Sequence, residues 1–171
     1  ANGPFDLDAA ATAANTLCPH WLGADSPLGV DALTVAWLVD GRTCRVFCNP
    51  PYRRGLVGQF VAKAALEPGR GHCQGTLLVP AATDQYWWHA YVWSQRLGGP
   101  YPPVVLDFPR GRVRFLRPDG RPAGSPTFAS VVVRFSVGSA LILTMWSHAL
   151  TPARDAGVLA IGWMTVSLPS R

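Results

Sequence analysis

Residues 44–65 limit the folds open to this chain, because a short apolar run, a rigid turn and a helix follow one another there almost without a gap. Residues 44–48 form a short run that is mostly apolar, as is typical of a buried strand. Pro50 and Pro51 then stiffen the turn. From residue 56 to 65, apolar side chains recur at the spacing of one helix face. A strand that leads directly into a helix is typical of α/β proteins, in which helices cover a largely parallel sheet.

Similar apolar runs, each bounded by turn residues, recur along the chain. A second helix is expected over residues 84–95, where an aromatic stripe occupies one face. After Arg110, two strand-like runs joined by a segment rich in proline and glycine predict an antiparallel hairpin with a long loop. The sequence therefore predicts an α/β fold with a mixed sheet, mainly parallel with a C-terminal antiparallel hairpin, and helices on both faces. The expected strands are 5–8, 44–48, 75–79, 104–108, 113–116 and 128–135.

The length and composition are those of one folded domain. The 171 residues are 49% hydrophobic and 15% charged, which excludes a disordered chain. The net charge of +5 comes almost entirely from arginine, since Lys63 is the only lysine. Arginine suits bidentate phosphate contacts, so a polyanionic partner is one explanation of the charge. The other explanation is a coding bias toward Ala, Gly, Pro and Arg.

Several classes of function lack their sequence signatures. The cysteines form no C-x-x-C pair and no signal-peptide pattern is present, so we expect free thiols in a reducing cytoplasm and no metal site. The apolar stretch 140–146 is far shorter than the about 20 residues that span a bilayer, so no membrane anchor is expected. No G-x-S-x-G nucleophile elbow supports hydrolase chemistry. The cysteines are Cys18, Cys44, Cys48 and Cys73.

The turn after residues 44–48 carries residue types that suit the chemistry of an exocyclic amine, namely Asn49, Pro50, Pro51 and Tyr52. The Asn49 side-chain oxygen and the Pro50 carbonyl can each accept one amine hydrogen and so aim the nitrogen lone pair at an electrophilic methyl group. Tyr52 offers a flat ring on which a base extruded from a duplex can stack. The turn also stands at the expected carboxyl end of a strand, where α/β sheets bind ligands. The alternative is a plain rigid turn in which Asn49 caps the following helix.

Together with other segments, this turn resembles the phage-type DNA N-6-adenine methyltransferase family, whose catalytic motif is Asn-Pro-Pro-Tyr. The resemblance covers residues 4–135, and the ordered series is far more specific than any single segment. The matching segments are Phe5-Asp6-Leu7-Asp8-Ala9-Ala10-Ala11 with Asn15, Asp31-Ala32-Leu33 before Trp37, residues 46–52, Phe60-Val61-Ala62-Lys63-Ala64, residues 77–84 with Trp87-Trp88, and Gly111-Arg112-Val113-Arg114-Phe115.

The resemblance implies a class I methyltransferase fold, which is Rossmann-like, with S-adenosylmethionine as the cofactor. The substrate would be an adenine in double-stranded DNA, in the cytoplasm of a bacterial host and in a phage or prophage context. By the same resemblance, residues 49–52 would be catalytic. Two acids with their neighbours would bind the cofactor, namely Asp8 with Ala9 and Ala10, and Asp31 with Ala32. The alternative for either acid is a helix cap or a solvated loop.

The chain departs from the family pattern around the expected cofactor site. No G-x-G loop follows the first expected strand, where residues 9–11 are alanines instead. Family members usually carry a segment ahead of that strand, whereas here only residues 1–4 precede it, as in a truncated or a naturally minimal form. We expect residues 1–171 to form a single methyltransferase domain in which 136–171 are a C-terminal extension of unassigned role.

Arginines mark the expected DNA contacts. Arg53 and Arg54 directly follow the catalytic turn. Arg110, Arg112 and Arg114 alternate with glycine or apolar residues, so a strand would place their guanidinium groups on one face for phosphate contacts. A charged edge strand that protects the sheet from aggregation has the same pattern.

Two other functions agree with the same residues. The acceptor geometry suits any planar amine or amide, so RNA or a protein glutamine is a second class of substrate. A catalytically degenerate DNA-binding module is consistent with the missing glycines. Neither a recognition sequence nor an oligomeric state follows from the sequence.

Overall fold

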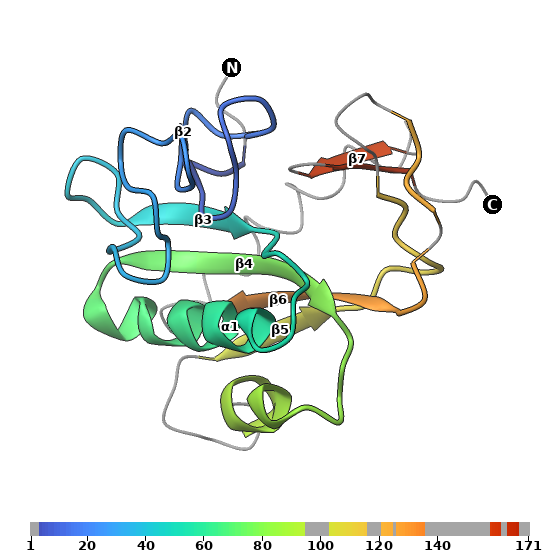
Figure 1. The fold of residues 1–171 in the computed structure, drawn as a ribbon. Coiled ribbons are helices and arrows are strands. Elements are labelled where there is room, and N and C mark those ends of the chain that lie inside the picture. Colours follow the sequence, from blue (N-terminus) through green and yellow to red (C-terminus); the bar gives the residue numbers. More distant parts are fainter. Residues whose placement is uncertain are drawn as a thin grey trace.

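The computed structural model describes residues 4–94, 103–115, 121–124 and 126–135, and the backbone of 158–161 and 164–167. Its centre is a six-stranded sheet with the order β2-β1-β3-β4-β6-β5 (Figure 1). A separate antiparallel pair joins β7 (Val158–Ile161) to β8 (Met164–Ser167). The protein therefore has a mixed α/β structure. The strands of the main sheet are β1 (Leu7–Asp8), β2 (His20–Trp21), β3 (Cys44–Cys48), β4 (Cys73–Pro80), β5 (Val104–Asp107) and β6 (Ser130–Phe135).

The main sheet is parallel on one side and antiparallel on the other. β1 pairs in parallel with both β2 and β3, and β3 pairs in parallel with β4. β6 lies between β4 and β5 and runs antiparallel to both. The carboxyl ends of β1, β3 and β4 consequently lie at one edge of the sheet, toward which the arrowheads of β3 and β4 point in Figure 1. The mixed sheet, mainly parallel among its first strands, confirms the prediction.

The helices of the described residues lie together on one face of the sheet. α1 (Leu56–Leu66) follows Gly55, whose φ of 82° lies in the left-handed region open to glycine, and leads into the 3-10 turn η1 (Pro68–Arg70). η2 (Trp88–Trp93) is π-helical. A Cβ at Gly58 would lie 3.0 Å from the Trp87 ring, so this glycine allows the two helices to pack closely. No helix in the described part of the chain has the length and hydropathy needed to cross a membrane.

Alternation along the strands sends apolar side chains into two cores. The larger core lies between the sheet and the helices and includes Val46, Leu77 and Phe60. The smaller core lies on the other face and includes Phe47 and Leu78. Because both faces of these central strands are buried, β3 is apolar except for Arg45 and β4 is apolar over residues 77–80, and these apolar runs made the strands predictable.

Residues 113–115 form no strand, contrary to the prediction, and residue 116 lies outside the described residues. The physical reason is that β4 and β5 already pair with the two edges of β6, so no edge of β6 is left for a further strand. The antiparallel hairpin therefore joins β5 to β6. Val113 and Phe115 instead pack on the second face of the sheet, in the smaller core. In the described part of the chain this face is covered by non-helical chain, whereas helices were expected there.

Other boundaries also differ from the prediction. The helix expected at 84–95 begins at residue 86 and contains the π-helical η2, and residue 95 lies outside the described residues. β2 was not predicted because its His20 and Trp21 are only half-buried and too few to show a periodicity. The pair β7 and β8 is all that the structure describes of the expected extension 136–171.

Candidate active site

A cavity opens at the carboxyl ends of β1 and β3. Its volume of about 480 Å³ falls within the range of about 300–1,000 Å³ that is usual for small-molecule sites. Its position agrees with the rule that α/β sheets bind ligands beyond the carboxyl ends of parallel strands. The lining residues are Ala9, Ala10, Ala11, Leu22, Gly23, Val30, Asp31, Ala32, Asn49, Pro50, Pro51, Tyr52 and Phe60.

The alanine turn at residues 9–11 forms one wall of the cavity. The Ala9 amide donates a hydrogen bond to the Phe47 carbonyl (2.8 Å), and the Ala11 amide donates one to the Leu22 carbonyl (3.1 Å). Gly23 passes so close to this turn that a Cβ on it would lie 1.9 Å from the Ala11 carbonyl oxygen. A glycine from the next segment therefore provides a close backbone approach where no G-x-G loop is present.

Asp8 ends β1 directly before this turn, and its side chain is buried. The residue is 1% exposed. Its Oδ1 accepts a hydrogen bond from the Ala10 amide at 3.2 Å, whereas Oδ2 is buried and has no hydrogen-bond partner among the described residues. Burial raises the pKa of Asp8 to about 6, although the backbone amides of Ala10 and Leu17 lower it. A buried acid with one unpartnered oxygen thus lies next to the cavity wall.

Asp31 and Ala32 form another part of the lining. Asp31 is exposed, and its Oδ1 accepts a hydrogen bond from the Leu33 amide at 3.0 Å. The Ala32 carbonyl accepts a hydrogen bond from the Trp37 indole at 2.8 Å, which anchors this segment in the larger core. Asp31 therefore lines the cavity while its carboxylate accepts a hydrogen bond within its own turn.

Asn49 leaves β3 at the cavity with its side-chain oxygen buried. The Oδ1 atom has no hydrogen-bond partner among the described residues. Asn49 does not cap α1, because the N-cap position is Gly55. The alternative in which Asn49 serves as a helix cap is therefore wrong. A buried acceptor left without a partner costs about 1–3 kcal/mol, which a ligand N–H group would recover.

Tyr52 lines the cavity and is held from several sides. Its hydroxyl donates a hydrogen bond to the Leu78 carbonyl of β4 at 3.1 Å. Its ring makes edge contacts with Phe115 and Phe128, at centroid distances of 5.7 and 5.4 Å. Burial raises the pKa of the phenol, so Tyr52 stays neutral at physiological pH.

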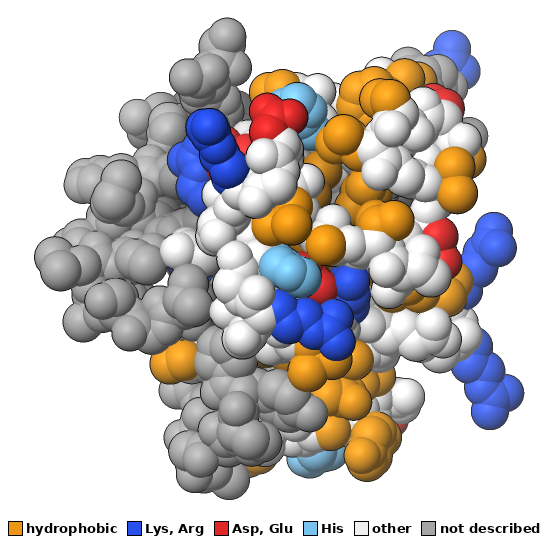
Figure 2. Space-filling view, turned by 90° about the vertical axis from the view of Figure 1, so that its left-hand side faces the viewer, with side chains coloured by type: hydrophobic (Ala, Val, Ile, Leu, Met, Phe, Trp, Pro, Cys, Tyr) orange, Lys and Arg blue, Asp and Glu red, His pale blue; other side chains and the backbone are white. Residues whose placement is uncertain are grey.

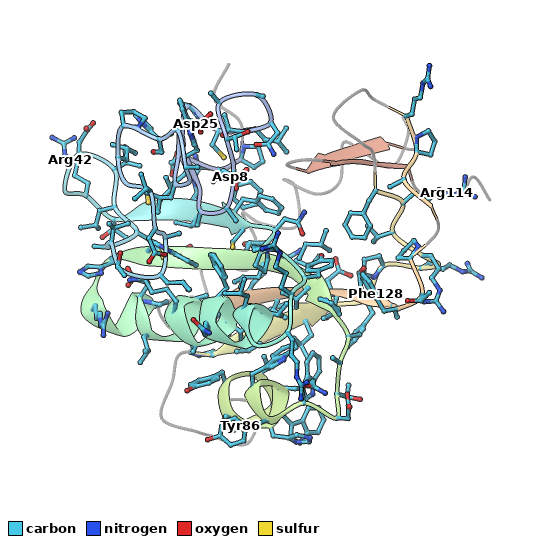
Figure 3. The ribbon with its side chains drawn as sticks, in the orientation of Figure 1. Asp8, Asp25, Arg42, Tyr86, Arg114 and Phe128 are labelled. Carbon is cyan, nitrogen blue, oxygen red and sulfur yellow. The ribbon has the colours of Figure 1, made fainter. Side chains whose placement is uncertain are left out.

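The expected DNA-binding arginines are exposed. Arg53 and Arg54 follow Tyr52 directly, and the other three are Arg110, Arg112 and Arg114. Although residues 113–115 form no strand, the alternation holds, since Val113 and Phe115 are only 2% and 5% exposed. Phe115 contacts Tyr52, and this contact brings the basic segment to the carboxyl end of the sheet, where Figure 3 shows Arg114.

The family comparison shows to which enzyme family the chain belongs. A family model described as DNA N-6-adenine-methyltransferase (Dam) matches residues 1–122, which include all the lining residues. The chain belongs to the Dam family. Membership of the Dam family assigns it to DNA adenine-N6 methylation. No curated protein matches it significantly.

The Dam-family cavity brings together segments that are distant in the sequence. Every residue expected to be catalytic or to bind the cofactor lines it, except Asp8, which is adjacent to it. Sequence reasoning missed Ala11, Leu22, Gly23, Val30 and Phe60. The only sequence signal for Gly23 was an isolated glycine between apolar residues and a turn. The helical spacing of Phe60 led to its assignment to the core and not to the site.

The cysteines of this Dam-family chain are buried and unpaired. Burial raises the pKa of both Cys18 and Cys44 to about 12, and it also raises the pKa of Cys48 and Cys73. Since the thiolate is the reactive and metal-binding form, these groups are unreactive as they stand. Among the residues that the structure describes, no cluster of His, Cys, Asp and Glu is arranged to hold a metal ion.

Proposed function

We propose that the chain transfers a methyl group from S-adenosylmethionine to the N6 amine of an adenine flipped out of double-stranded DNA. The observation that carries this proposal is the convergence of the expected cofactor residues and of residues 49–52 on one cavity. Direct transfer requires such adjacency, because the methyl group and the amine must meet in one oriented step. We further propose that residues 1–171 form a single domain of the class I, Rossmann-like fold, which the mixed sheet and the place of the cavity support.

The cavity lining is compatible with S-adenosylmethionine. The small side chains of residues 9–11 and Ala32 leave space beside the backbone. Asp8 Oδ2 is a buried acceptor with no hydrogen-bond partner among the residues that the structure describes, and Asp31 offers a second carboxylate for hydroxyl or amino donors. Phe60 adds an apolar wall from α1. When bound, S-adenosylmethionine supplies an electrophilic methyl group, and the lining residues hold it and exclude water.

Asn49 and Pro50 supply the acceptors for the adenine amine. The buried Asn49 Oδ1 accepts no hydrogen bond from the described part of the chain, so an amine N–H group is a suitable donor for it. The Pro50 carbonyl accepts the second hydrogen, which directs the nitrogen lone pair toward the methyl group. The adenine ring stacks on Tyr52. These are positioning and electrostatic effects that need no covalent intermediate.

Exposed arginines support double-stranded DNA as the partner. Arg53 and Arg54 adjoin the catalytic turn, and Arg110, Arg112 and Arg114 reach the same end of the sheet through Phe115. Guanidinium contacts to phosphates give affinity that depends on salt and little on sequence. For a DNA-modifying chain of this family we propose the bacterial cytoplasm, in a phage or prophage context, as the place of action.

Two measurements test the proposal. Calorimetric titration with S-adenosylmethionine tests the cofactor site, and incorporation of tritiated methyl groups into DNA, RNA and protein tests the substrate. We expect cofactor binding and labelling of DNA. Absence of both would overturn the proposal. DNA binding without transfer would favour the degenerate module, and labelling of RNA or protein alone would favour the second class of substrate.

The Asn49→Ala variant tests the role of the turn. We expect transfer to DNA to fall by about 100-fold or more, because the amine loses a preorganised partner. Its affinity for S-adenosylmethionine should stay close to that of the wild type, since Asn49 is assigned to the amine. A variant that methylates DNA at the wild-type rate would contradict the assigned role.

A further inference from the structure

Three aromatic rings form a cluster beside the active-site cavity. Tyr52 contributes one ring, and Phe115 and Phe128 contribute the others from non-helical chain on the second face of the sheet. The Tyr52 ring is inclined by 78° to Phe115 and by 77° to Phe128, which is the favourable edge-to-face arrangement. Phe115 and Phe128 also contact each other, at 6.4 Å between centroids.

These contacts determine the plane of the Tyr52 ring. The hydrogen bond to Leu78 fixes the position of the hydroxyl but leaves the ring free to turn about its long axis. Two nearly perpendicular neighbours oppose that rotation, because turning the ring would lose both favourable edge-to-face contacts. The surface offered to a base is therefore oriented before DNA binds, which lowers the cost of binding.

The same contacts tie the basic segment to the active site. The Phe115 carbonyl accepts a hydrogen bond from the Ala123 amide at 2.7 Å, and Val113 is buried on the same face. Arg112 and Arg114 alternate with these anchors and stay exposed. Figure 3 shows Phe128 near the carboxyl end of β4 and Arg114 farther out on the same side of the molecule. Phe115 is bonded directly to Arg114 and contacts the Tyr52 ring, so a backbone shift in this segment would also displace the ring that Tyr52 contacts.

We propose that Phe115 and Phe128 are positioning residues, which act through Tyr52 to orient the target base and to couple phosphate contacts at Arg112 and Arg114 to that orientation. The inference rests on the proposed function of the Asn49 turn. It assigns a role to two aromatic residues that neither line the cavity nor belong to the turn.

Substitution of either phenylalanine by leucine tests this role. Phe115→Leu and Phe128→Leu keep apolar side chains but remove the aromatic contacts with Tyr52, so we expect kcat for methylation of unmethylated plasmid DNA to fall by about tenfold. Calorimetry should show an unchanged Kd for S-adenosylmethionine. Phe128 is only half-buried, so its substitution leaves a folded protein even if that of Phe115 does not.

Phe135→Leu is the matched control. Phe135 is 1% exposed and pairs with Gly75 near the amino end of β4, away from the cavity. This variant should be destabilised as a core substitution, with kcat of the folded protein unchanged. An equal loss of kcat in the control would show that general destabilisation, and not ring orientation, lowers activity.

A Tyr52→Ala background separates positioning from a purely structural role. If the phenylalanines act through Tyr52, their substitution lowers kcat in the wild type but not further in Tyr52→Ala. Equal losses in both backgrounds, or an unchanged kcat in the single variants, would overturn the inference alone. Failure of the wild type to label DNA would overturn the proposed function and this inference with it.

Discussion

Among the described residues, two carboxyl groups are buried near opposite ends of the parallel strands, and their pKa values shift in opposite directions. Asp8 lies at the carboxyl end of β1, whereas Glu67 follows α1 near the amino ends of β3 and β4. Their exposures are 1% and 0%. Burial to the same degree nevertheless leads to opposite shifts in pKa, upward for Asp8 and downward for Glu67.

Partners explain the difference. Glu67 Oε1 lies 2.8 Å from Lys63 Nζ, and Oε2 lies 2.8 Å from His72 Nδ1 and accepts a hydrogen bond from the Trp37 amide at 3.0 Å. Burial raises the pKa of Glu67, but its hydrogen bonds with Lys63, Trp37 and His72 lower the pKa by more, so the net shift is downward. Figure 2, which views this side of the molecule, shows basic and His side chains gathered around an acidic one near its centre.

The comparison separates a structural site from a candidate binding site. At the amino end, the protein supplies the partners of its buried acid, so the charges serve to hold α1 against the chain before β3 and β4. At the carboxyl end, Asp8 Oδ2 and Asn49 Oδ1 have no hydrogen-bond partner in the described part of the chain and lie beside a cavity. Four predictions test this contrast, in order of decreasing effect.

The largest effect is expected from Glu67→Gln. The change leaves the buried Lys63 ammonium group without its counter-charge, so the free energy of unfolding should fall by about 3–5 kcal/mol, as measured by urea denaturation. The exposed pair between Asp6 and Arg45 provides the control, and Asp6→Asn should cost only about 0–1 kcal/mol. Equal costs for the two variants would show that the Glu67 network is no more important than a surface pair.

Asp8→Asn should change how stability depends on pH. The folded pKa of Asp8 is about 6 against an ordinary value of 3.8, so the folded state binds more protons between these values. The contribution of Asp8 to the free energy of unfolding therefore decreases as the pH rises from about 4 to about 6, by about 3 kcal/mol in total. Asn does not titrate, so the variant should gain stability relative to the wild type across this window. Parallel denaturation curves over pH 4–7 would contradict the raised pKa.

The contribution of Glu67 to the free energy of unfolding depends on pH in the opposite direction. Its folded pKa lies below the ordinary 4.5, so its contribution is fully present above that value. It is lost as the pH falls through the folded pKa. The two carboxyl groups therefore act on stability in opposite directions as the solution is acidified.

Gly23→Ala should weaken the binding of S-adenosylmethionine by about tenfold or more, because the new Cβ forces the cavity wall apart at Ala11. Calorimetric titration measures this change. Gly69→Ala is the control, because a Cβ at Gly69 would meet no atom within 4 Å. The affinity of this variant for S-adenosylmethionine should equal that of the wild type. If the two variants bind S-adenosylmethionine with equal affinity, Gly23 does not belong to the binding site.

The smallest effect is expected from single arginines at the carboxyl end. Arg114→Ala should lower DNA affinity and reduce the slope of log K against log salt by about 0.9, the value for one phosphate contact. Arg42 is also exposed but lies far from Arg114 in Figure 3, so Arg42→Ala should leave the slope unchanged. A change of slope in both variants would indicate that net charge, and not the basic segment, governs DNA binding.

Local patterns made part of this protein predictable. The bounds of β3 were predicted without error, and the apolar stripe at residues 56–65 lies within α1, because strand and helix periodicities are visible over a few consecutive residues. Residues 113–116 show the limit of such patterns. Their alternation predicted which side chains are buried, but pairing depends on whether a neighbouring strand has a free edge, and β6 has none.

The sequence by itself determined the strand, the rigid turn and the residue types that suit an amine, since all of these follow from neighbours along the chain. Only the tertiary structure decided which distant residues complete the site. Gly23 approaches Ala11, and Phe115 and Phe128 contact the Tyr52 ring. Glu67 has an ion-pair partner at each carboxylate oxygen, whereas Asp8 Oδ2 has no hydrogen-bond partner among the described residues. The physical reason is that these relations depend on distances across the sheet, which the spacing of residues along the chain does not specify.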